Sequence, residues 1–147
     1  MIRPFSLSDL NSILQIESQS FPKSPYDWTT FLSLHHFYPK TFLVCLNANP
    51  GQKEEKILGY IIFSQDGHII SIAVHPLHRR KGIGARLLQK AMNIPNLQKA
   101  WAEVRRSNLG AQAFYLRMEF QIVGLVPNYY GNEDALIVQW TPPLPRR

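Results

Sequence analysis

The stretch Ile70-Ser-Ile-Ala-Val-His-Pro-Leu-His-Arg-Arg-Lys-Gly-Ile-Gly-Ala-Arg-Leu-Leu88 carries the strongest indication of fold and function in this chain. It predicts an apolar strand, a turn bounded by Pro76, a basic triplet, two glycines and then a helix. Glycines in the first turn of a helix let backbone N–H groups come close to a ligand, because no Cβ intervenes. Those N–H groups have no partner within the helix, and the helix dipole adds positive potential, so they can bind phosphate. The stretch therefore predicts a site for an anionic, phosphate-bearing ligand.

The spacing of the glycines does not fit two common nucleotide-binding motifs. A dinucleotide fingerprint, G-x-G-x-x-G, needs a third glycine where Leu87 stands, although Glu103 lies roughly where its acidic residue would be. The Walker-type pattern G-x-x-x-x-G-K-[ST] does not occur in the sequence. The pattern that is present, Arg79-x-x-Gly82-x-Gly84 between a strand and a helix, resembles the acyl-CoA-binding signature of the GNAT family of N-acetyltransferases.

A second stretch narrows the resemblance. Glu103-Val-Arg-Arg-Ser-Asn108, with Tyr115 seven residues further on, is similar to the RimI-type branch of the family, which acetylates the N-terminal alanine of a ribosomal protein. Pro127-Asn-Tyr-Tyr130 and Glu133-Asp-Ala135 extend that similarity towards the C-terminus. The resemblance thus covers most of the chain and is strongest between residues 57 and 140.

The resemblance implies an α+β chain with the GNAT fold, in which helices flank a central mixed, mostly antiparallel sheet. Strands His68–Val74 and Ala100–Arg105 should run parallel because a helix connects them, and in the family this pair splays apart. The 147 residues, 45% of them hydrophobic, suffice for one core, so we expect a single domain over residues 1–147.

Periodicity and turn residues predict the remaining elements. A helix should begin after Ser6 or Ser8, with Leu10, Ile13 and Leu14 on one face. The other expected elements are a helix near Trp28–Leu34, strands Thr41–Leu46 and Ile57–Phe63 around a polar hairpin loop, a helix over Leu109–Met118 and a last strand, Ala135–Trp140.

The family's co-substrate, acetyl-CoA, is implied with the fold. In the family its pantetheine arm pairs with the backbone of the earlier splayed strand, and its pyrophosphate lies on the glycine turn. The residues expected to bind it are Ile72, Ala73, Val74, Arg79, Arg80, Lys81, Gly82, Ile83, Gly84, Ala85 and Asn108. Asn108 is also expected to cap the helix that follows it.

Glu103 is the sharpest catalytic candidate. Strand alternation puts Trp101, Glu103 and Arg105 on one face, so Glu103 could simply form an ion pair with Arg105 or face solvent. The resemblance instead implies a general base, directly or through water, since attack on a thioester needs a neutral amine and an α-amine has a pKa near ~8. Burial would raise the pKa of the carboxyl towards that range.

Tyr115 is the expected partner of Glu103. It belongs to the helical stripe Ala111, Phe114, Tyr115 and Met118, where an aromatic side chain can be part of the core. With Phe114 in that core position, the family resemblance assigns Tyr115 as the general acid that protonates the departing thiolate or stabilises its charge. Tyr129 and Tyr130 either pack within their loop or, as the resemblance implies, line the acceptor channel.

The composition sets bounds on other classes of protein. A lone cysteine, Cys45, fits a core position in a reducing compartment rather than a disulfide framework. His35-His36 lacks metal-ligand spacing, so no metal is expected. We expect a cytoplasmic protein that does not insert into a membrane, because the first residues do not resemble a secretory signal and no apolar run approaches ~20 residues. The net charge of +6 suits polyanions such as the coenzyme or a ribosomal surface.

These patterns together predict an acetyl-CoA-dependent N-acetyltransferase. The expected acceptor is the N-terminal α-amine of a protein such as a ribosomal protein. A small-molecule amine or a lysine acetyltransferase is the first alternative. A non-enzymatic nucleic-acid-binding module is the second, but the sequence lacks interleaved aromatic residues for stacking bases. One departure from the family is Glu119, which stands where a helix-ending glycine is usual and should cost about 0.5–1 kcal/mol if its backbone is left-handed.

Overall fold

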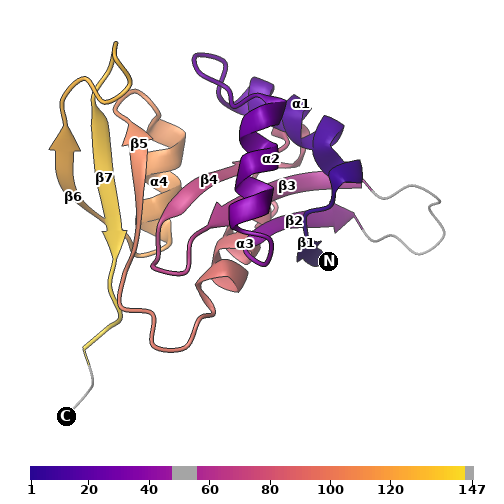
Figure 1. The fold of residues 1–147 in the computed structure, drawn as a ribbon. Helices are drawn as coiled ribbons and strands as arrows, with labels where there is room; N and C mark the ends of the chain where they lie inside the picture. The colour runs from indigo at the N-terminus through magenta and orange to yellow at the C-terminus, as the bar shows by residue number, and fades with distance from the viewer. Residues whose placement is uncertain (48–55, 145–147) are drawn as a thin grey trace. The chain divides into compact units, whose positions relative to one another are not determined.

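The computed structural model describes residues 1–47 and 56–144 (Figure 1). The chain divides into two compact units, one formed by Met1–Gln65 with Ile70–Asn93 and the other by Asp66–Ile69 with Ile94–Arg147. The predicted polar hairpin loop falls on residues 48–55, outside the described residues. The expectation of a single domain stays a prediction.

The first unit is built on a sheet with the strand order β1-β2-β3-β4. The strands are β1 Ile2–Pro4, β2 Phe42–Asn47, β3 Lys56–Phe63 and β4 Ile69–Val74. β2 pairs antiparallel with β3, as the predicted hairpin requires, and on its other edge with β1. β4 stands at the end of this order, so one of its edges has no neighbouring strand in the sheet.

Three helices complete the first unit: α1 Leu10–Ser20, α2 Trp28–Phe37 and α3 Ile83–Met92. A 3-10 turn, Leu7–Asp9, separates Ser6 from α1, so Ser6 precedes this turn rather than the α-helix itself. Asp27 starts α2 because its carboxylate accepts the backbone N–H of Thr30 at 2.9 Å. α2 continues three residues beyond the predicted Leu34.

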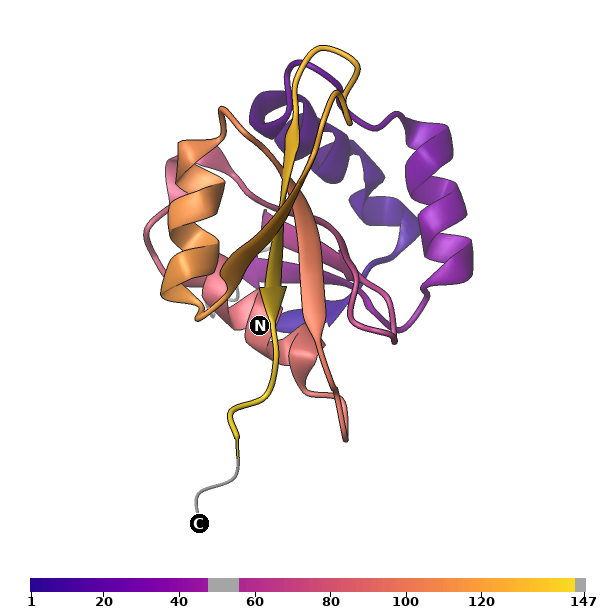
Figure 2. The same cartoon turned by 90° about the vertical axis from the view of Figure 1, so that its left-hand side faces the viewer.

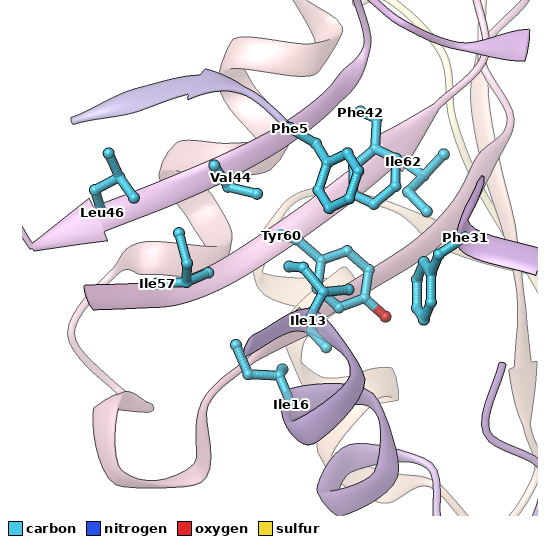
Figure 3. Close-up of a cluster of buried hydrophobic side chains, with 11 residues drawn as sticks. Phe5, Ile13, Ile16, Phe31, Phe42, Val44, Leu46, Ile57, Tyr60 and Ile62 are labelled. Carbon is cyan, nitrogen blue, oxygen red and sulfur yellow. The ribbon is translucent and has the colours of Figure 1, made fainter. Parts of the chain in front are cut away.

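Both faces of the first sheet are covered. Figure 1 shows α1 and α2 over one face and α3 over the other. Apolar side chains from β2 and β3 meet those of α1 and α2 around three rings, Phe31, Phe42 and Tyr60 (Figure 3). On α3 the apolar residues Leu87, Leu88 and Ala91 are all buried.

Gly59 on β3 is required by a close approach. A Cβ at this position would lie 2.8 Å from the carbonyl oxygen of Ala73 on β4 and 3.3 Å from Ile83 on α3. The missing side chain therefore lets β3, β4 and the first turn of α3 pack together. This packing holds the end of β4 and the start of α3, which are the two ends of the turn predicted to bind phosphate.

The second unit contains β5 Ala100–Arg105, α4 Leu109–Arg117, β6 Gln121–Val126 and β7 Ala135–Trp140. β7 lies between β5 and β6 and pairs antiparallel with both (Figure 2). The described residues thus form two sheets where the sequence predicted one central sheet. The expected parallel contact between the splayed strands is present as a single bridge between His68 and Trp101.

Several remaining sequence expectations can be compared with the described residues. Cys45 is buried in β2, as predicted. In the described part of the chain, no helix is long and apolar enough to cross a membrane. Within the same residues, no group of three or more histidine, cysteine or acidic side chains could hold a metal ion. A cytoplasmic location stays a prediction.

Candidate active site

The phosphate-facing turn connects β4 to α3 in the first unit. After the 3-10 turn Pro76–His78, the chain passes through Arg80 with a φ of 63° and Gly82 with a φ of 77°. Gly82 is the N-cap of α3, so Ile83, Gly84 and Ala85 form its first turn with N–H groups that lack helical partners. Open space surrounds the position of a Cβ on Gly82, so its left-handed backbone, not packing, favours glycine there.

The charges around this turn suit a diphosphate. Arg80 and Lys81 are exposed, and the first turn of α3 carries no acidic residue. Arg79 has structural contacts as well, because its Nε donates to the carbonyl of Val74 at 3.2 Å and its Nη2 to the hydroxyl of Ser20 at 3.3 Å. The residues predicted for the pyrophosphate therefore suit the phosphates of acetyl-CoA. Arg79 stabilises the turn through these hydrogen bonds, and Arg80 and Lys81 present positive charge to solvent.

The strand expected to hold the pantetheine arm is β4. Ala73 is buried, whereas Ile72 and Val74 are partly exposed. Because β4 ends its sheet, its backbone offers an edge of the kind that an extended amide-containing arm can pair with. The described residues bring this strand and the phosphate-facing turn together in one unit.

In the second unit Glu103 forms a pair with His68. The burial of β5 alternates as predicted, with Ala102 and Val104 buried and Glu103 on the partly exposed face. His68 Nε2 lies 2.8 Å from Glu103 Oε2. The same imidazole stacks on Trp101, with ring centres 5.2 Å apart and planes 11° from parallel. The indole thus holds the imidazole in place against the carboxylate.

The electrostatics of Glu103 differ from the sequence expectation. Burial pushes up the pKa of its carboxyl, but the hydrogen bond and the charge of His68 outweigh burial and leave the pKa below its ordinary value. The partner that the structure gives Glu103 is His68, where the sequence offered Arg105 as an alternative. Arg105 contacts Glu133 instead, with Nη1 3.1 Å from Oε1.

Tyr115 is the buried residue of its helical stripe. Its side chain is 4% exposed, whereas Phe114, the residue expected in the core, is only partly buried. The Tyr115 ring contacts Phe114 and Phe120 at centroid distances of 5.2 Å each. Burial first, and then the negative charge of Glu103, raise the pKa of the Tyr115 phenol well above its ordinary value. Tyr115 is therefore both a core residue and a phenol that senses the Glu103 carboxylate.

Tyr129 and Tyr130 follow β6 in the same unit. Tyr129 is 51% exposed, and the two rings meet edge to face with centroids 4.9 Å apart. Partial burial and the charge of Glu103 raise the pKa of Tyr129, so the ring senses the same carboxylate as Tyr115. The second unit thus gathers a carboxylate, an imidazole and three phenols.

Two further residues complete the comparison with the sequence. Asn108 caps α4 as predicted, because its Oδ1 accepts the N–H of Ala111 at 3.0 Å; its contact with the coenzyme stays a prediction. His68 was not recognised from the sequence, where it marked only the start of a strand. The available signal was its place at the head of a strand expected to run parallel to the one carrying Glu103.

The family model of the acetyltransferase (GNAT) family matches residues 10–120. The chain belongs to this family. The GNAT chain is therefore an acetyl-CoA-dependent N-acetyltransferase, and the alternative of a non-enzymatic nucleic-acid-binding module is set aside.

Relatives of the GNAT chain include enzymes that act on protein N-termini. It is 38% identical to an uncharacterized N-acetyltransferase of Methanocaldococcus jannaschii over 94% of this chain and 89% of that protein. It is 30% identical to an N-alpha-acetyltransferase of Saccharolobus solfataricus, covering 93% and 90%. It is also 30% identical to a putative ribosomal protein bS18-alanine N-acetyltransferase of Bacillus subtilis, covering 93% and 92%.

The fold of the GNAT chain is similar to a solved structure as well. The crystal structure of Ard1 from Thermoplasma volcanium superimposes with a TM-score of 0.83 at 28% sequence identity, and 96% of each chain is covered. The mixed α/β architecture with antiparallel sheets flanked by helices is therefore that of GNAT acetyltransferases, as the sequence predicted.

Proposed function

We propose that this chain acetylates the N-terminal α-amine of a protein, as RimI-type enzymes do, with a ribosomal protein among the possible acceptors. The observation that carries the proposal is the pair of His68 and Glu103, joined at 2.8 Å and accompanied by tyrosines that sense the Glu103 charge. The relatives from Saccharolobus solfataricus and Bacillus subtilis, named for Nα and N-terminal alanine acetylation, support the choice of acceptor.

Proton removal from the acceptor is assigned to the pair rather than to Glu103 alone. An α-aminium with a pKa near ~8 gives up its proton poorly to a carboxylate whose pKa is depressed. An imidazole nitrogen is a common general base, so His68 offers the pair a second proton-accepting group beside the Glu103 carboxylate. Glu103 then stabilises the positive charge that forms on the imidazole, directly or with a water between the pair and the amine.

Tyr115 is assigned to the leaving group. As the amine nitrogen bonds to the acetyl carbon, the carbon–sulfur bond breaks and negative charge develops on sulfur. A phenol with a strongly raised pKa keeps its proton and donates a hydrogen bond to this charge more readily than it transfers the proton outright. Of the two roles considered for Tyr115, charge stabilisation is therefore favoured.

The other predicted residues are assigned to binding. Ile72, Ala73 and Val74 would hold the pantetheine arm, and the turn from Arg79 to Ala85 would hold the pyrophosphate, with Asn108 as a further contact. Tyr129 and Tyr130 would bind the first residues of the acceptor through their exposed ring surface. These assignments rest on the charges and exposed backbone groups of the turn and on the family resemblance.

A peptide-array acetylation assay tests the proposed acceptor. The array would carry peptides with free N-termini, including N-terminal alanine, peptides with blocked N-termini that contain lysine, and small amines. Incorporation of acetyl groups into the free N-termini would support the proposal. Incorporation only into lysine side chains, or only into small amines, would overturn it and favour the other acceptor class.

A further inference from the structure

Arg105 shares the partly exposed face of β5 with Glu103 and lies two residues after it. Its guanidinium carbon is 4.1 Å from the centre of the Tyr130 ring, the geometry of a cation–π contact. Its Nη1 also lies 3.1 Å from Glu133 Oε1 and 3.3 Å from Asn132 Oδ1. Arg105 on β5 thus contacts three residues of the loop between β6 and β7.

Glu133 also connects the same loop to the turn after β5 through its second carboxylate oxygen. Oε2 accepts the backbone N–H of Ser107, in the turn after β5, at 2.7 Å, while its backbone carbonyl accepts the N–H of Tyr130 at 3.1 Å. The side chains of Arg105 and Glu133 are only 14% and 15% exposed. An ion pair with this degree of burial and these extra hydrogen bonds is screened less by water than a surface pair.

We propose that Arg105 is a positioning residue for the acceptor: with Glu133 it fixes the β6–β7 loop so that Tyr129 and Tyr130 are held ready to bind the acceptor near Glu103. The inference rests on the proposed function, because it takes the two tyrosines as acceptor-binding groups. It assigns to Arg105 no contact with either substrate. Arg105 acts through the ring of Tyr130 and through the carboxylate that closes the loop.

A neighbouring pair offers a matched control. Arg106 also contacts the loop, with Nη1 3.3 Å from Asp134 Oδ2, but its side chain is 65% exposed. Exposed pairs of this kind contribute little to stability. Replacing Arg106 therefore removes the same charge one position away while leaving the contact with Tyr130 and the buried pair intact.

The first measurement compares Arg105→Met with Arg106→Met. Arg105→Met should raise the KM for a peptide acceptor about tenfold or more, with kcat and the KM for acetyl-CoA close to wild type, because a loosened loop must be ordered on binding. Arg106→Met should leave all three constants near wild type. Arg105→Lys, which keeps the charge without the planar fork, should recover part of the loss. An unchanged acceptor KM in Arg105→Met would overturn the inference.

The second measurement does not depend on the identity of the acceptor. Hydrogen exchange of the backbone amides of Tyr130 and Gly131, which donate to Glu133 and Asn128 within the loop, should accelerate in Arg105→Met but not in Arg106→Met. Glu133→Gln provides a second route if Arg105→Met is poorly folded, since it keeps an acceptor for Ser107 and removes the charge. It should raise the acceptor KM similarly. The acceptor KM of the double variant should be no higher than that of the single variant with the larger increase, because both changes break the same contact. Loop exchange rates equal to wild type in both single variants would reject the positioning role even if the enzyme acetylates N-termini, whereas failure of the peptide array would reject the proposed acceptor alone.

Discussion

His68 Nε2 lies 2.8 Å from Glu103 Oε2, and this contact sets the ionisation of the carboxylate. Burial acts to raise the pKa of Glu103, while the hydrogen bond and charge of His68 lower it, and the lowering effects prevail. Removing the imidazole nitrogens should leave burial as the dominant influence. The pH dependence of the enzyme can therefore report whether the pair operates as a unit.

His68→Phe tests this directly, because a phenyl ring can still stack on Trp101 but offers Glu103 no hydrogen bond or charge. The pKa of Glu103 should rise, so the midpoint of a carboxyl chemical-shift titration should move to higher pH, and turnover should fall because the imidazole that accepts the proton is gone. His68→Gln, which retains a donor, should move the midpoint less. A midpoint at the wild-type position in His68→Phe would show that the imidazole does not control the ionisation of Glu103.

Glu103→Gln keeps the size of the side chain but removes the negative charge. If Glu103 takes the proton or stabilises the protonated imidazole, turnover should fall by roughly 10²–10⁴-fold. The binding of acetyl-CoA, measured by calorimetry, should persist because its predicted contacts lie elsewhere. Near-wild-type turnover across the pH range would reduce Glu103 to a structural acid.

Gly84→Val tests the predicted pyrophosphate turn. Gly84 is the second residue of α3, and a branched side chain there would fill space next to the unpartnered N–H groups, so the KM for acetyl-CoA should rise at least about tenfold. Gly110 occupies the same position in α4 and is exposed, so Gly110→Val is the matched control and should leave this KM nearly unchanged. Equal coenzyme affinity in the two variants would remove Gly84 from the site.

The sequence predicted best where local pattern and burial agree. The strand predicted from the apolar alternation over Ala100–Arg105 has the bounds observed for β5, and the helix predicted after the two glycines is α3. Two strands were missed. β1 has only three residues, and β6 is largely exposed on both faces, so neither shows the alternation that marks a half-buried strand.

The candidate site was predictable only in part. Motifs located Glu103, Tyr115 and the glycine turn, but the partners of charged residues depend on long-range packing. His68 is 35 residues before Glu103, and Glu133 is 28 residues after Arg105, so neither contact could be read from residues close in the sequence. The sequence predicted a raised pKa for Glu103 because it did not reveal the contact with His68, which lowers that pKa.

Glu119 lies two residues after the end of α4 and has a φ of 68°, so its backbone is left-handed, the condition under which replacing the family's usual glycine carries a cost. Glu119→Gly should relieve the strain and stabilise the fold by about 0.5–1 kcal/mol, a rise in melting temperature of about 1–4 °C. Glu119→Ala keeps the Cβ, which causes the strain, and removes the rest of the side chain, so it should show no such gain. A melting temperature no higher in Glu119→Gly than in Glu119→Ala would contradict the strain.

Tyr115→Phe separates the two roles that the structure gives to this residue. The substitution keeps the ring between Phe114 and Phe120 and removes only the hydroxyl, so the free energy of unfolding should change by no more than about 1 kcal/mol. If the phenol stabilises the departing thiolate, kcat should fall by about 10²-fold while both substrates still bind. A thiolate is already a fair leaving group near neutral pH. A thioester whose departing thiol is more acidic needs less stabilisation of the sulfur charge, so it should recover part of the lost rate. A stable Tyr115→Phe enzyme with normal turnover would leave Tyr115 as a core residue alone.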